Sequence, residues 1–196
     1  GCPVKKVCKT GAGAALLSDP DVGARVVEAL VAAVNVPVTV KMRRGVTPAT
    51  ADPIGAARRF IAAGAAAIFY HPRTASEEYE GRANHEHTAE LVAAVDVPVI
   101  ASGDIDTPRE ALRLVTEVGA SAVAIGRPAL GNPWIFREML DACRAAPTDL
   151  VSVVDEVERF ASDVRAALGD ARACAYMRKF YPWYTAGFAV SVGDRE

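Results

Sequence analysis

The sequence has little of what disulfide frameworks, metal sites and membrane anchors need. Its 196 residues include four cysteines and three histidines. Cys2 and Cys8 form no C-x-x-C pattern, and Cys143 and Cys174 lie far from both. This scatter favours reduced thiols and predicts no metal site. No stretch is long and apolar enough to cross a bilayer, and none resembles a signal peptide. We therefore expect a cytoplasmic protein with neither a metal nor a membrane partner.

The sequence also lacks a strong net charge, although its charge is unevenly spread. The formal net charge is −2 at pH 7, which excludes a general attraction to nucleic acid. Residues 1–50 nevertheless carry seven lysines and arginines against three carboxylates, and the remaining residues are acidic. With 51% hydrophobic and 23% charged residues, the composition is that of a globular protein. A basic region on such a protein can still bind phosphate groups.

Two pairs of similar segments indicate the architecture. ALVAAVNVPVTV (29–40) resembles ELVAAVDVPVIA (90–101), and GAAAIFYH (64–71) resembles GASAVAIG (119–126). In each segment a helix ends and a continuously apolar strand follows. Such strands are typical of a parallel sheet that is buried on both faces.

Helix signals alternate with these strands. Asp-Pro or Thr-Pro pairs, followed by glycine beyond the helix end, predict helices that begin near residues 19, 52 and 107. A weaker helix is expected over 84–95. The predicted strands span 36–42, 66–71, 97–102 and 121–126. This order predicts four βα units of an α/β protein, in a barrel or a doubly wound sheet.

The strand ends favour the barrel. Each predicted strand finishes with polar or charged residues or glycine, in the segments VTVKMRRG, IFYHPRT, VIASGD and AIGRP. This is expected where catalytic groups lie at the C-terminal face of a TIM barrel. Four strands are half of a (β/α)8 barrel. The predicted helices carry apolar stripes, which include Val22, Val26, Val27, Leu30, Val31 and Val34 in the first helix and Leu112 and Val115 in the fourth.

The pattern changes from Pro147 onward. Residues 149–168 and 170–181 read as two helices with no strand between them. The stretch YMRKFYPWY (176–184) mixes aromatic residues with Arg178 and Lys179, a combination suited to stacking on single-stranded nucleic acid. The alternative is that these aromatic side chains pack the helix pair.

Several motifs together resemble one family. In order and spacing, five segments resemble the flavin-dependent tRNA-dihydrouridine synthases. They are GCPVKKVCKTGAGAALL, VPVTVKMRRG, YHPRT, ASGDI and IGRPALGNPWIF. The resemblance runs from residue 1 to about residue 144 and continues weakly through ACAYMRKFYPWYTAGF. In that family the GCP loop follows the fourth barrel strand. The resemblance therefore implies the second half of an FMN-binding TIM barrel over 1–146, and part of a C-terminal helical, tRNA-binding-like region over 147–196.

The resemblance also implies a reaction. Family members reduce the C5–C6 double bond of uridine in tRNA, with NADPH as the reductant of FMN. The flavin N5 gives a hydride to C6 and a cysteine protonates C5, and Cys2 matches that cysteine. A thiol with a pKa of ~8.5 is mostly protonated at neutral pH and can act as the acid. A buried structural cysteine is the alternative, and that is our interpretation of Cys8.

The family pattern implies a set of cofactor contacts. They are Lys41, His71, Ser102, Gly103, Asp104, Gly126 and Arg127. Lys41 would stabilise negative charge on the reduced flavin, while Gly103, Gly126 and Arg127 would meet its phosphate. Ser102 stands where the family usually has asparagine. Of the other histidines, His85 and His87 are expected at solvated helix positions.

A second set is expected to contact the substrate or its RNA phosphates. It comprises Lys5, Lys6, Arg43, Arg73, Arg178 and Lys179. Surface ion pairs remain an alternative for Arg43. Pro72, before Arg73, replaces a glycine that is commoner in the family.

Two other functions stay open. One is a small-molecule FMN barrel oxidoreductase that resembles dihydroorotate or dihydropyrimidine dehydrogenase, and the other is a truncated, inactive relative that binds RNA or a partner. The basic first 50 residues and the 176–184 stretch favour tRNA. For these 196 residues alone we expect weak or no FMN binding, little activity, and self-association through open barrel edges.

Overall fold

The computed structural model describes residues 1–144 and 153–185. The chain divides into two compact units, Gly1–Ile125 and Gly126–Glu196, which are described separately below. The predicted boundary between 146 and 147 falls outside the described residues.

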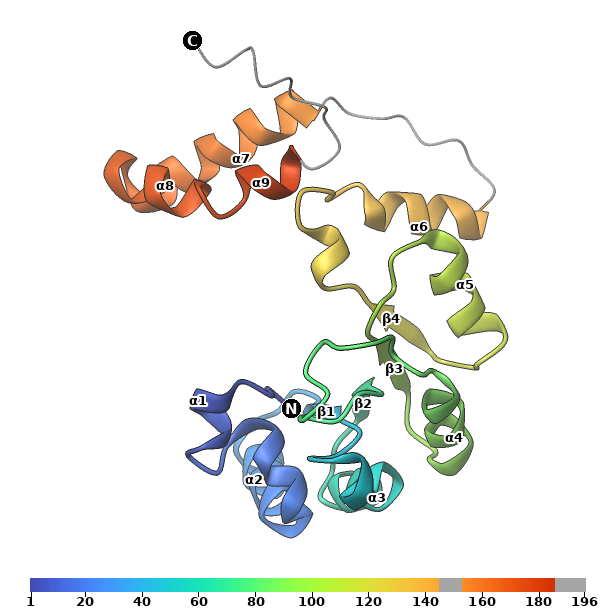
Figure 1. The fold of residues 1–196 in the computed structure, drawn as a ribbon. Helices are drawn as coiled ribbons and strands as arrows, with labels where there is room; N and C mark the ends of the chain where they lie inside the picture. Colours follow the sequence, from blue (N-terminus) through green and yellow to red (C-terminus); the bar gives the residue numbers. More distant parts are fainter. Residues whose placement is uncertain (145–152, 186–196) are drawn as a thin grey trace. The chain divides into compact units, whose positions relative to one another are not determined.

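The first unit alternates helices and strands (Figure 1). Its helices and 3₁₀ turns are α1 (Lys5–Cys8), η1 (Gly13–Ser18), α2 (Pro20–Ala33), η2 (Pro48–Thr50), α3 (Pro53–Ala62), α4 (Glu86–Ala94) and α5 (Pro108–Thr116). Its strands are β1 (Thr39–Arg43), β2 (Ala67–His71), β3 (Val99–Ser102) and β4 (Ala122–Ala124). The strands form one parallel sheet in the order β1-β2-β3-β4, so that each pairs with the next along the chain. The predicted α/β class and the alternation are confirmed.

The predicted helix starts are confirmed, and the capping side chains explain them. Asp52 accepts a hydrogen bond from Gly55 N (2.8 Å), and Thr107 Oγ1 accepts one from Glu110 N (3.2 Å). Asp19 caps α2 in the same way. In all three helices proline occupies the first turn, where no hydrogen-bonding N–H is needed.

Two strands begin two or three residues later than predicted, and the other two begin one residue later. β1 begins at Thr39 and β3 at Val99, not at 36 and 97. Pro37 and Pro98 precede these starts, and proline has no N–H to donate to a neighbouring strand. The C-terminal ends of β2 and β3, His71 and Ser102, lie where the sequence predicted them.

One face of the sheet packs on helices. Figure 1 shows α2, α3, α4 and α5 on the same side of the strands. The buried core between them includes Val27, Met42, Phe60, Ile68, Tyr70, Leu91 and Val99. Since successive side chains of a strand point to opposite faces, the residues between these core positions form the other face.

The other face carries a row of residues that are in register across all four strands. Lys41 pairs with Phe69, Phe69 with Ile100, and Ile100 with Ala122. None of these four residues is buried within the described chain, whereas Met42 and Ile68 on the helix-packed face are. The face opposite the helices is therefore open within the first unit.

Two of the predicted apolar stripes are only partly buried. In α2 only Gly23 and Val27 are buried, and Val26 and Leu30 are each 49% exposed. In α5 the buried residues are Ala111 and Leu114, whereas Leu112 and Val115 are exposed. Periodicity locates an apolar stripe, but only the neighbouring element decides which part of the stripe is covered.

The second unit is helical where it is described. It contains η3 (Arg127–Ala129), α6 (Ile135–Arg144), α7 (Val153–Leu168), α8 (Asp170–Met177) and α9 (Tyr181–Tyr184). Val164, Ala173 and Met177 form a small core, and the Phe160 and Phe180 rings meet edge to face with centroids 5.2 Å apart. The predicted helix break is confirmed at Gly169, which has φ 76°. The predicted start of the first helix, at 149, lies outside the described residues.

Candidate functional site

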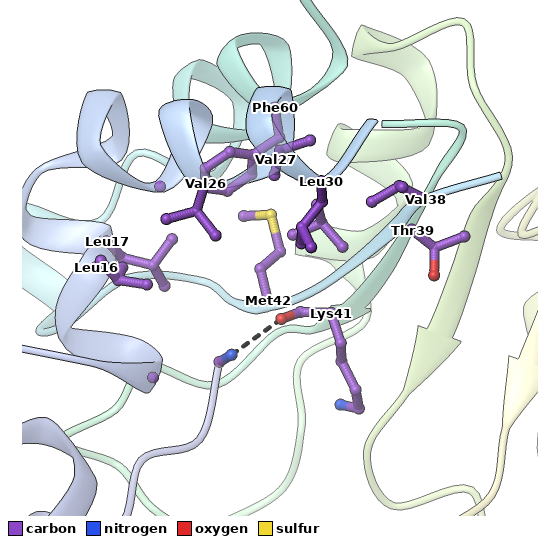
Figure 2. A pocket seen from close by; sticks show the side chains of 14 residues that line it. Leu16, Leu17, Val26, Val27, Leu30, Val38, Thr39, Lys41, Met42 and Phe60 are labelled. Carbon is purple, nitrogen blue, oxygen red and sulfur yellow. Dashed lines mark hydrogen bonds between the residues drawn. The ribbon is translucent and has the colours of Figure 1, made fainter. Parts of the chain in front are cut away.

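The segment that carries Cys2 is attached to the carboxyl end of β1. The Gly1 nitrogen donates to the Lys41 carbonyl oxygen at 3.0 Å, on the edge of β1 away from β2 (Figure 2). The Cys2 carbonyl oxygen accepts from Ala14 N at 2.9 Å and from Cys8 Sγ at 3.4 Å. Cys2 itself is exposed and its thiol is free. The backbone of this loop is thus fixed while the Cys2 thiol stays accessible.

The first predicted cofactor ligand, Lys41, reaches across the open face of the sheet. Its Nζ lies 3.5 Å from Ser102 Oγ on β3. Partial burial lowers the pKa of Lys41, and the nearby Arg43 cation lowers it further. Within the described residues no carboxylate lies within 4.0 Å of Lys41 Nζ. The ammonium group is therefore able to interact with an anionic or carbonyl oxygen of a ligand.

His71 lies on the same face as Lys41, at the end of β2, and is 7% exposed. Burial, together with the cations Arg43, Lys41 and Arg73, lowers its pKa to about 3, and the Asp104 carboxylate opposes this shift. The ring is therefore neutral at physiological pH. A neutral imidazole donates one hydrogen bond and accepts another.

Arg73, predicted to contact substrate, is instead engaged by the protein. It is 2% exposed and forms a bidentate ion pair with Asp104, at 3.2 and 2.5 Å. Asp104, predicted to contact the cofactor, also accepts from Ala83 N at 2.8 Å. These two residues connect the loop after β2 to the loop after β3.

Arg43, at the end of β1, contacts the loop between β2 and α4. It is 3% exposed, and its Nη1 donates to the carbonyl oxygens of Thr74 (3.0 Å) and Glu78 (2.6 Å). Its guanidinium also lies 5.4 Å from the centre of the Tyr79 ring. A guanidinium has no acceptor and five donors, so these carbonyl contacts give Arg43 a structural role in the loop.

The remaining predicted residues fall into two groups. Lys5 and Lys6 are exposed on α1, next to Cys2, and Lys5 pairs with Glu78 at 3.8 Å. The others belong to the second unit and are exposed there. They are Gly126, Arg127, Arg178 and Lys179. Lys179 Nζ lies 5.4 Å from the centre of the Tyr176 ring.

Sequence reasoning missed His85. It is 6% exposed and not solvated, with Nε2 2.9 Å from Gly103 O and Nδ1 3.1 Å from Thr88 Oγ1. His85 precedes the first residue of α4, and burial lowers its pKa. His87 is partly exposed beside Glu90 and Arg44.

No metal-binding cluster of three or more His, Cys, Asp or Glu residues occurs in residues 1–144 and 153–185. In the same part of the chain, no helix is long and apolar enough to cross a membrane.

Comparison with known proteins adds the decisive observation. The sequence profile of the family described as "Dihydrouridine synthase (Dus)" matches residues 1–194. This chain belongs to the dihydrouridine synthase family. The resemblance that its motifs predicted is thereby confirmed.

Individual relatives agree with this assignment. The tRNA-dihydrouridine synthase B of Xanthomonas axonopodis is 39% identical over 188 residues, which cover 94% of this chain and 57% of the relative. The protein of the same name from Pseudomonas syringae is 40% identical over 190 residues, covering 95% and 56%. The chain thus spans little more than half the length of the family members it matches. One solved structure, titled "Crystal structure of Amycolatopsis orientalis BexX/CysO complex", aligns at 20% identity and a TM-score of 0.42, covering 68% of this chain and 55% of that one.

Proposed function

We propose that this chain supplies the proton-donating half of an FMN-dependent tRNA-dihydrouridine synthase. One observation carries the proposal. The Cys2 loop is attached, through Gly1, to the strand whose Lys41 side chain lies on the open face with His71 and Ser102. A thiol, an ammonium group and a neutral imidazole thus come from the ends of neighbouring elements, as in the active sites of parallel barrels.

The residues present fit a flavin. Lys41 offers a part-buried cation without a carboxylate partner in the described chain, and Ser102 and His71 add hydrogen-bonding groups beside it. We propose that these three residues hold FMN together with Gly103 of the same unit. For Gly126 and Arg127, which belong to the second unit, the phosphate contact stays a prediction from the family pattern. When bound, FMN would supply the hydride. The Lys41 ammonium would stabilise negative charge at the ring system.

Cys2 is proposed as the acid. Adding hydride to C6 of uracil places negative charge on C5 and the C4 carbonyl oxygen. The exposed Cys2 thiol would donate its proton to C5, which removes that charge and completes the reduction. Lys5 and Lys6 on α1 would attract the RNA backbone next to Cys2, and Arg178 and Lys179 would do so from the second unit.

We further propose that the sheet is the second half of an eight-stranded barrel, which ends near residue 146, and that residues from 147 onward belong to a helical RNA-binding region. The strand order is sequential and does not reverse as it does in a doubly wound sheet. Helices α2 to α5 lie on one side of the sheet, and the opposite face carries the polar strand ends (Figure 1). A closed barrel would cover that face.

The edge of β1 fits this arrangement. A cavity of about 210 Å³ lies between α2, η1 and β1, and its walls are mostly apolar (Figure 2). Leu16, Leu17, Val26, Leu30 and Met42 are among the residues that line it. We propose that side chains of the βα unit preceding the GCP loop fill this cavity, and that copies of the 196-residue chain associate through this edge when that unit is absent.

The test compares two proteins. One is residues 1–196 alone, and the other is the same sequence preceded by the N-terminal segment of the Pseudomonas syringae relative. We expect bound oxidised flavin, detected by visible absorbance, and NADPH-dependent dihydrouridine formation in tRNA only in the second protein. Flavin bound tightly by residues 1–196 alone would contradict the half-barrel proposal. A soluble fusion without flavin or activity would contradict the proposed function.

A further inference from the structure

The Arg73 guanidinium has as many acceptors around it as it has N–H groups. Nε donates to Glu80 O at 3.0 Å, and Nη2 donates to Gly81 O at 2.6 Å and to Asp104 Oδ2 at 2.5 Å. Nη1 lies 3.2 Å from Asp104 Oδ1 and 3.3 Å from His71 Nε2. Five donors therefore meet five acceptors, and one of these acceptors is the imidazole ring of His71.

This arrangement determines which nitrogen of His71 carries the proton. A guanidinium can only donate, so Nε2 of His71 must accept. A neutral imidazole that accepts at Nε2 carries its proton on Nδ1. In residues 1–144 and 153–185, the Arg73 contact is the one hydrogen bond recorded for the His71 ring. The Nδ1–H group is therefore left for a ligand.

The loop after β3 holds the ring in this position. A Cβ atom added to Gly103 would lie 2.9 Å from His71 Nε2, closer than such contacts allow. Gly103 has φ 110°, which glycine adopts readily, and Asp104 has φ 51°, a conformation of a non-glycine residue that the surroundings must stabilise. His85 stabilises the Gly103 carbonyl oxygen, and Arg73 with Ala83 N stabilises the Asp104 carboxylate.

We propose that Arg73 is a positioning residue that fixes His71 as its Nδ1–H tautomer, so that His71 offers its ligand a hydrogen-bond donor. The ligand group facing His71 is then an oxygen acceptor, a phosphate or carbonyl oxygen. The assignment of this oxygen to FMN rests on the proposed function. The tautomer of His71 is independent of it. Arg73 thus acts through His71 and does not touch the substrate.

Ring ¹⁵N shifts of His71 test the tautomer directly. The protein has three histidines, so the His71→Asn variant identifies the His71 signals in a long-range ¹H–¹⁵N spectrum at pH 7. We expect a protonated Nδ1 and an unprotonated Nε2. In Arg73→Met we expect the proton to redistribute to Nε2, and in Arg82→Met we expect no change. Arg82 is the matched control, since it lies in the same loop but is 77% exposed and pairs with Asp106.

Two results would overturn the proposal. One is a wild-type His71 that is protonated on Nε2, and the other is a folded Arg73→Met protein whose His71 spectrum equals that of the wild type. If Arg73→Met does not fold, the double variant Arg73→Met/Asp104→Asn leaves no unpaired carboxylate and is expected to give the same redistribution.

Flavin titration of His71→Asn and His71→Gln, both made in the fusion with the N-terminal segment of the Pseudomonas syringae relative, identifies the ligand group. In His71→Asn the amide nitrogen can take the place of Nδ1, and in His71→Gln it can take the place of Nε2. We expect FMN affinity to fall about tenfold further in His71→Gln than in His71→Asn, which corresponds to the loss of one hydrogen bond. Equal affinities would overturn the donor role. The expected tautomer in residues 1–196, together with no flavin binding by the fusion to the N-terminal segment of the Pseudomonas syringae relative, would contradict the proposed function alone.

Discussion

The two regions that flank β1 differ in how completely their polar and apolar side chains find partners within the chain. At the carboxyl end, the donors of Arg43 and Arg73 reach carbonyl and carboxylate oxygens within residues 1–125. At the edge toward α2, apolar side chains such as Val26 and Leu30 are half exposed around a cavity. The first region is held by contacts within this chain, whereas the second has exposed apolar side chains that we propose a further segment covers.

This comparison separates structural from ligand-binding residues in the proposed site. Arg73 has a protein acceptor for each of its N–H groups, Asp104 pairs with it, and Arg43 Nη1 donates to two loop carbonyl oxygens, so these three residues hold the loops. Three groups can still donate a hydrogen bond or a proton to a ligand. They are the Lys41 ammonium group, the Nδ1–H of His71 and the Cys2 thiol. The resemblance to the family assigned all of them to ligands, because a sequence motif does not distinguish a residue that binds from one that positions.

The largest expected effect on stability comes from the first region. Arg73→Met leaves the Asp104 carboxylate buried without its cation, which should lower the free energy of unfolding by about 3–5 kcal/mol. Urea denaturation measures this. Arg82→Met should change the value by less than about 0.5 kcal/mol, because its ion pair is exposed. Equal losses in the two variants would contradict the distinction between them.

Gly103→Ala should be the next most damaging change. The added methyl group meets the His71 ring, and φ 110° is unfavourable for alanine, so we expect a loss of about 2–4 kcal/mol. Gly81→Ala is the control: its φ is 61° but the space around it is open, and about 1 kcal/mol is expected. Thermal unfolding of both variants checks this, and a smaller loss at Gly103 than at Gly81 would contradict it.

A change at the apolar edge of β1 should have different effects in residues 1–196 alone and in the fusion to the N-terminal segment of the Pseudomonas syringae relative. Leu30→Glu in residues 1–196 alone should reduce self-association, measured by sedimentation, since it places a charge on an exposed apolar edge. In the protein that includes the N-terminal half, the same change should cost about 1–3 kcal/mol of stability. A Leu30→Glu variant that leaves the longer protein unaffected would mean that this edge is not covered there.

The last effect concerns pH. His71 has a pKa lowered to about 3, whereas an unfolded histidine titrates near ~6.5. Between these values the unfolded chain binds more protons, so the contribution of neutral His71 is fully present above pH 6.5 and is lost as pH falls toward 3. Relative to His71→Asn, the wild type should lose up to about 1 kcal/mol per pH unit in this window. A pH-independent difference in the free energy of unfolding between the two proteins would contradict this.

The sequence predicted the elements well where local chemistry decides them. Asp52, Thr107 and the prolines after them cap their helices as expected, and His71 and Ser102 end their strands as expected. Such features depend on neighbours within a few residues.

Two features could not be read from the sequence, because they depend on distant parts of the chain. Arg73 meets Asp104, 31 residues away, and His85 meets Gly103 across 18 residues. The exposed side of α2 depends on what packs against β1, which periodicity does not specify. Long-range partners, and not residue types, decided these outcomes.

The most direct test of Cys2 as the acid is the activity of Cys2→Ala in the fusion to the N-terminal segment of the Pseudomonas syringae relative. Because the Cys2 thiol is exposed and its loop is held by backbone hydrogen bonds, we expect unchanged stability and retained flavin. The rate of dihydrouridine formation in tRNA should fall by about 10²–10⁴-fold, the contribution of a positioned proton donor. A Cys2→Ala protein that reduces tRNA at the wild-type rate would contradict the account.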